Sequence, residues 1–130
     1  MIVVDASALL EVLLNTSAAA SIADRLFADG ETLHAPHLLD LEIAQVLRRY
    51  TASGAMDPRR GQQALDDLAD LPLVRYPHDV FLPRIWELRD NLTAYDAAYV
   101  ALAEALPAPL LTRDVALASR GVHRARVDLV

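Results

Sequence analysis

The sequence predicts an α/β fold of three layers, with helices on both sides of a parallel sheet of four to five strands. Short apolar runs, some rich in β-branched residues, alternate along the chain with longer stretches of helical pattern. Such alternation is typical of a parallel sheet that is covered on both faces. Acidic residues follow the first and fourth of these runs, at the sheet edge where ligands bind in such folds.

The predicted strands are short and mostly apolar. The N-terminal run "IVVD" is β-branched and ends in an acid, which indicates a buried strand. The five strands are expected at residues 2–5, 32–35, 73–77, 109–114 and 126–130.

Helices are expected between these strands, at residues 7–15, 16–30, 36–54, 57–71, 78–90 and 91–106, with a short one after residue 114. For the second helix, Thr16 or Ser17 is a candidate N-cap and Gly30 a stop signal. Pro36 is expected to open the third helix, and Gly54 to close it.

The fourth helix has the clearest start signal in the chain. Asp57 is suited to the N-cap position, and Pro58 to the first helical position.

Length and composition limit the classes of function. The 130 residues fit a single domain with one hydrophobic core. The chain has no cysteine and no lysine, which excludes thiol catalysis, a P-loop lysine and Schiff-base chemistry. The net charge of −6 argues against binding nucleic acid by bulk positive charge, but it suits an acidic pocket for a divalent cation. The apolar N-terminus is interrupted by acids, so we expect no signal peptide, no membrane span and a cytoplasmic location.

Two acids follow predicted strands at the same edge of the sheet. Asp5 follows the first strand and Asp114 the fourth. Each has an ordinary alternative role as the N-cap of the next helix. Their shared position at the carboxyl ends of strands makes a ligand site the competing interpretation.

Glu42 lies on the third predicted helix, where its same-face neighbours are mostly apolar: Leu38, Leu39, Gln45 and Val46. A carboxylate on such a face needs a cation or a shifted pKa. A salt bridge to Arg49 or another arginine is the structural alternative.

Asp96 lies in the first turn of an Ala-rich helix. With Thr93 it fits the spacing of a capping box, although Glu or Gln is the usual partner. It also shares a face with Leu92, Tyr99 and Val100, which is an inward direction. If these four acids converge, they need a hard divalent cation such as Mg²⁺ or Mn²⁺, which is typical of metal-assisted phosphodiester hydrolysis.

Four segments, each supplying one of the acids, resemble the PIN domains. They are "VVDAS", "LLDLEIAQVLRR", "LTAYDAAYVALAEAL" and "LLTRDVALA", and they occur in the order and spacing of that family. The chain looks most like the VapC-type toxins of bacterial toxin–antitoxin pairs. The resemblance covers residues 1–130 as a single PIN domain, with the PIN-like three-layer fold.

This resemblance implies a Mg²⁺-dependent endoribonuclease, with Mn²⁺ as a substitute, that cleaves RNA to leave a 5′-phosphate and a 3′-hydroxyl. It assigns the catalytic and metal-binding roles to Asp5, Glu42, Asp96 and Asp114. Supporting roles near the acids fall to Ser7, Thr93 and Thr112.

The resemblance also implies partners: an RNA substrate, a cognate VapB-type antitoxin in a groove of the early helices, and a second copy in a homodimer. A housekeeping RNA-processing nuclease of the same class and a non-catalytic binding module are the alternatives. A receiver domain and a haloacid-dehalogenase-like phosphatase are disfavoured, because the chain lacks the required lysine and the paired aspartates after the first strand.

Overall fold

The computed structural model describes residues 1–119 and 122–130. Within these residues, five strands form one sheet in the order β3-β2-β1-β4-β5, and every neighbouring pair is parallel. The strands are β1 (Ile2–Val4), β2 (Leu33–Pro36), β3 (Leu73–Tyr76), β4 (Leu110–Thr112) and β5 (Val127–Leu129). The predicted fold class and the five predicted strands are confirmed.

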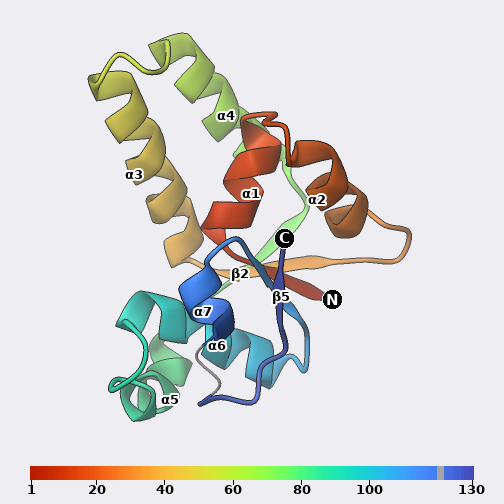
Figure 1. Cartoon of the computed structure of the whole chain (residues 1–130), viewed down its shortest axis with the longest axis vertical. Coiled ribbons are helices and arrows are strands. Elements are labelled where there is room, and N and C mark those ends of the chain that lie inside the picture. Colours follow the sequence, from red (N-terminus) through yellow and green to blue (C-terminus); the bar gives the residue numbers. More distant parts are fainter. Residues whose placement is uncertain (120–121) are drawn as a thin grey trace.

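Helices cover both faces of this sheet (Figure 1). One side carries α1 (Ala6–Leu13), α2 (Ala19–Leu26), α3 (Leu38–Ala52) and α4 (Pro58–Asp70). The other side carries the 3-10 turn η1 (Asp79–Phe81), α5 (Leu82–Glu87) and α6 (Ala94–Ala105). The short helix α7 (Val115–Ser119) packs against β4 and β5.

The centre of the core lies between β1 and α6. Val3 and Val4 are fully buried, because β1 has a strand on each side and helices on both faces. All residues of α6 from 97 to 103 are buried, and most of them are alanine or other small or apolar residues. Small side chains let this helix lie close to the sheet, which explains the Ala-rich pattern.

The predicted start of α2 was wrong. Its N-cap is Ala18, and neither Thr16 nor Ser17 caps it. The hydroxyl of Thr16 instead donates to the carboxylate of Glu11, so it closes the turn after α1. Gly30, with φ +82°, lies in the loop before β2 and does not end the helix.

The predicted role of Pro36 was also wrong. Pro36 is the last residue of β2 and pairs with Tyr76 of β3. Its fixed φ is compatible with extended backbone, and the next N–H, of His37, donates to the Tyr76 carbonyl at 2.9 Å. The strand therefore continues through the proline, and α3 begins at Leu38.

The boundaries between α3 and α4 are as predicted. Gly54, with φ +80°, follows the C-cap of α3, in the left-handed conformation that glycine adopts without strain. The Asp57 side chain accepts a hydrogen bond from the N–H of Arg59, with Pro58 opening α4. In the described part of the chain, no helix has both the length and the apolar character needed to cross a membrane.

Candidate metal-binding active site

The candidate site lies where the strand order reverses. The chain runs outward from β1 through β2 to β3, then returns to place β4 on the other side of β1. The carboxyl ends of β1 and β4 are therefore neighbours, and the N–H of Asp5 donates to the Leu111 carbonyl at 2.9 Å. Open parallel sheets bind ligands at this kind of switch point.

Asp5 is held by two hydroxyls. It is only 7% exposed, and its Oδ2 accepts hydrogen bonds from Ser7 Oγ at 2.8 Å and Thr112 Oγ1 at 2.7 Å. Each hydroxyl also accepts a backbone N–H, from Arg113 and Asp114 respectively, both at 3.0 Å. The Asp5 side chain is thus fixed against both α1 and the turn after β4.

This arrangement places Ser7 and Thr112 beside an acid, as predicted. Both bind Oδ2, so the other oxygen of Asp5 is the one available to a ligand among the described contacts. Their contribution to the chemistry stays a prediction.

Glu42, on α3, is bound by a tyrosine. Tyr99 Oη donates to Glu42 Oε1 at 2.6 Å, and Tyr99 is fully buried in α6. None of the ion pairs among residues 1–119 and 122–130 involves Glu42, so the expected alternative of an arginine partner is not observed.

The electrostatics of Glu42 show which acids are near it. Burial raises the pKa of the Glu42 carboxyl, and the negative charges of Asp5 and Asp96 raise it further. The hydrogen bond from Tyr99 acts in the opposite direction, because it favours the charged form. Three of the four predicted acids therefore share one electrostatic environment.

Asp96 and Thr93 form the start of α6. Thr93 is the N-cap, and its Oγ1 accepts a hydrogen bond from the N–H of Asp96 at 3.2 Å. Asp96 is half-buried, while Thr93 is exposed. Thr93 thus fixes the helix turn that carries Asp96, and its supporting role in the site stays a prediction.

Asp114 has the capping role that the sequence offered as an alternative. Its Oδ1 accepts hydrogen bonds from the N–H groups of Ala116 at 2.9 Å and Leu117 at 3.4 Å. It follows β4, at the same sheet edge as Asp5. Its N–H donates to Thr112 Oγ1, which also donates to Asp5, so hydrogen bonds connect the ends of β1 and β4.

The donor chemistry fits a hard divalent cation. In the described residues, no group of three or more His, Asp or Glu side chains already has the geometry to hold a metal. Burial is the main cause of the raised pKa of Glu42, and the charges of Asp5 and Asp96 nevertheless add to it. Oxygen ligands with excess negative charge are those that Mg²⁺ and Mn²⁺ prefer, and a cation between them would relieve the repulsion.

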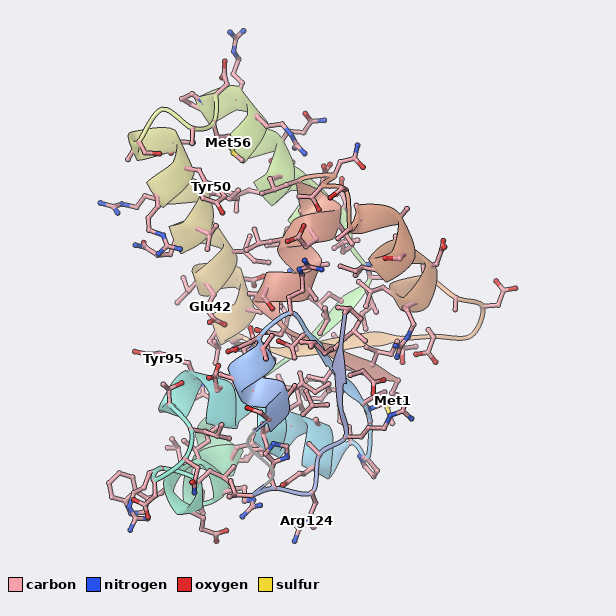
Figure 2. All side chains as sticks on the ribbon, viewed as in Figure 1. Met1, Glu42, Tyr50, Met56, Tyr95 and Arg124 are labelled. Carbon is pink, nitrogen blue, oxygen red and sulfur yellow. The ribbon has the colours of Figure 1, made fainter. Side chains whose placement is uncertain are left out.

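Two hollows lie beside these acids on α3. One is lined by Glu42 together with Leu38, Leu41, Gln45, Val46, Arg49 and Tyr95. The other includes Ser7 and lies between α1 and α3, and Arg49 lines both. Figure 2 shows Glu42 at the end of α3 that faces Tyr95 at the start of α6.

Tyr99 has no functional role among the predictions from the sequence. The available signal was its spacing, since a residue three positions after Asp96 shares its helix face. The contact with Glu42 joins residues 57 positions apart, so no local pattern indicates it.

The chain matches a protein-family model, and it is similar to known sequences and solved structures. The PIN domain model matches residues 2–121. The whole chain is 45% identical to "Ribonuclease VapC9" of Mycobacterium tuberculosis and covers 98% of it. Among solved structures, PAE2754 from Pyrobaculum aerophilum has a TM-score of 0.72 at 26% identity, covering 99% of this chain and 83% of that one. VapBC2 from Rickettsia felis, bound to a DNA fragment from its promoter, has a TM-score of 0.70 at 14% identity, covering 99% and 98%, which shows the fold alone.

Proposed function

Because this chain belongs to the PIN domain family, we propose that it is a metal-dependent endoribonuclease that acts as the toxin of a type II toxin–antitoxin pair. The observation that carries the proposal is that Glu42 feels the charges of both Asp5 and Asp96, with Asp5 at the switch point of the sheet. Similarity over the full length to a protein named Ribonuclease VapC9 supports RNA cleavage as the activity. It also favours the toxin role over a housekeeping nuclease or a binding module.

In this proposal, Asp5, Glu42 and Asp96 hold Mg²⁺, or Mn²⁺ in its place, and Asp114 completes the acidic group. When bound, such an ion supplies Lewis-acid stabilisation of the phosphate and lowers the pKa of water. Ser7 and Thr112 orient Asp5 through Oδ2, and Tyr99 orients Glu42 through Oε1. These hydrogen bonds would hold the carboxylates of Asp5 and Glu42 in fixed orientations before the substrate binds.

The cation also resolves a charge conflict with the substrate. The protein carries a net charge of −6, and RNA is a polyanion. Neutralising Asp5, Glu42 and Asp96 would let a phosphate approach, and Arg49 offers a positive group in the hollow that Glu42 also lines. An RNA substrate in turn suits action in the cytoplasm.

Two protein partners follow from the same proposal. A VapB-type antitoxin would cover the hollow between α1 and α3 that Ser7 lines. A second copy of the chain would form a homodimer. Exposed apolar side chains around the site, such as Leu41 and Tyr95, are suited to such contacts.

RNA cleavage by purified protein tests the proposal. With Mg²⁺ or Mn²⁺ we expect cleavage of cellular RNA at a few sites, with 5′-phosphate products, and none with EDTA. Asp5→Asn should reduce the rate roughly 100-fold or more, because it removes a charged ligand of the cation.

Asp57→Asn is the matched control. It removes one negative charge at the start of α4 and keeps a good N-cap. Cleavage that survives EDTA, or that is equal in wild type and Asp5→Asn, would contradict the metal-dependent mechanism.

A further inference from the structure

Tyr99 places a phenol hydroxyl in the interior of the protein, in contact with Glu42. Its side chain is fully buried, and its Oη donates to Glu42 Oε1 at 2.6 Å. A buried phenol needs a hydrogen-bond partner. Here the partner is a carboxylate that two other acids repel.

The phenol oxygen lies between the three segments that carry these acids. Tyr99 is one turn after Asp96 on α6, and Glu42 is on α3. The backbone N–H of Ala6, directly after Asp5, faces the same phenol oxygen. The packing of α1 and α6 therefore sets the position of the phenol oxygen. The phenol oxygen in turn determines where the Glu42 carboxylate lies.

Without this hydrogen bond, nothing else in the described contacts would hold the Glu42 carboxylate near its acidic neighbours. Repulsion from Asp5 and Asp96 would favour rotamers that turn it into the hollow beside Gln45 and Arg49. Binding through Oε1 also leaves Oε2 as the oxygen available to a ligand.

We propose that Tyr99 is a positioning residue that holds Glu42 in its metal-binding orientation before the cation arrives. This inference rests on the proposed metal-dependent function. Tyr99 itself touches neither the cation nor the RNA, since its hydroxyl is used by Glu42 and its ring is enclosed in the core. Partners that orient a ligand in this way typically change metal affinity 10–100-fold when they are lost.

The test compares Tyr99→Phe with Tyr76→Phe. Each variant loses one phenol hydroxyl that makes a side-chain hydrogen bond, but the partner of Tyr76 is His34 on the sheet, whereas the partner of Tyr99 is Glu42. Electron paramagnetic resonance of free Mn²⁺ gives the affinity of each protein for the ion alone. We expect about tenfold weaker binding in Tyr99→Phe and wild-type binding in Tyr76→Phe.

Steady-state cleavage adds a readout that a general loss of structure would not produce. For Tyr99→Phe, the Mn²⁺ concentration for half-maximal rate should rise about tenfold. The KM for RNA should stay at the wild-type value, and kcat should recover at saturating Mn²⁺. Unchanged Mn²⁺ affinity in Tyr99→Phe, or a loss of kcat that no Mn²⁺ concentration restores, would overturn the inference.

Two outcomes separate this inference from the proposed function. If wild type does not bind Mn²⁺, the proposed function fails and this inference fails with it. If wild type binds Mn²⁺ and Tyr99→Phe binds it equally, only the positioning role fails.

A measurement on wild type covers the case in which Tyr99→Phe does not fold. Mn²⁺ bound to Glu42 should perturb the ultraviolet absorbance of the buried phenol that donates to it. A difference spectrum without a tyrosine signal on saturation would overturn the inference.

Discussion

Glu42 carries a negative charge that the folded protein disfavours in the absence of a cation. Its pKa is raised by burial and by the charges of Asp5 and Asp96, while Tyr99 only partly offsets them. Between the ordinary pKa of a glutamate and this raised value, the folded state binds the proton more tightly than the unfolded state does. The free energy of unfolding therefore falls as pH rises through that interval, and Glu42 adds no further change above it.

Glu42→Gln should for this reason stabilise the metal-free protein at neutral pH. The amide oxygen can still accept the hydrogen bond from Tyr99, and the charge is gone. Thermal unfolding in EDTA should show a higher Tm for the variant at pH 7 and a difference that shrinks as pH falls toward 4.

Asp67→Asn serves as the control for net charge, because Asp67 is exposed on α4. A stability difference between Glu42→Gln and wild type that is constant from pH 4 to pH 7 would contradict the raised pKa.

Helix α6 links the site to the rest of the fold through its two ends. Its first turn carries Asp96, and near its last turn Glu104 accepts two hydrogen bonds from Arg84 of α5, at 2.9 and 3.0 Å. Glu104 also accepts the N–H of Arg124, in the segment before β5. Its side chain is 6% exposed, and the Arg84 hydrogen bonds hold its pKa below the ordinary value.

Arg84→Met should lower stability by roughly 2 kcal/mol, or about 6–10 °C in Tm, because it leaves the buried Glu104 carboxylate without its main partner. The loss should be full at neutral pH and should shrink as pH falls through the lowered pKa of Glu104, because protonation removes the charge in both proteins.

Arg59→Met makes the matched comparison, since Arg59 is 95% exposed and its ion pair lies at the surface. A Tm for Arg84→Met that equals that of Arg59→Met would show that the α5–α6 ion pair does not stabilise the fold.

The molecule as a whole leaves apolar side chains exposed on the helices around the site. Leu41 on α3 is 74% exposed, Tyr95 on α6 is 66% exposed, and both line the hollow that contains Glu42. Apolar side chains gathered in this way on both sides of a hollow are suited to protein contacts. The proposed homodimer would bury part of this surface.

Leu41→Glu should therefore weaken self-association while leaving Tm within about 1 °C of wild type, because the side chain makes little contact with its own fold. Sedimentation equilibrium would measure the mass of both proteins. A wild-type monomer, or a Leu41→Glu dimer of unchanged affinity, would show that this surface is not the contact between copies.

Local patterns in the sequence were sufficient to predict the parallel sheet, the five strands and the caps made by Asp57 and Thr93. They failed for Thr16, because its hydroxyl binds the Glu11 side chain and caps no helix. They also failed for Pro36, because it pairs with β3 and extends β2. The reason is that capping and strand patterns describe only contacts within a few residues.

For the site, strand-end positions and helix faces made Asp5, Glu42, Asp96 and Asp114 candidates, because both follow from the period of the sequence. The resemblance to PIN domains added Ser7 and Thr112, and the roles of all six residues stay predictions. Which partner each acid binds depends on packing between distant elements. The fold turned Glu42 toward a buried phenol 57 residues away, with no arginine as its ion-pair partner, and engaged Asp114 in a helix cap.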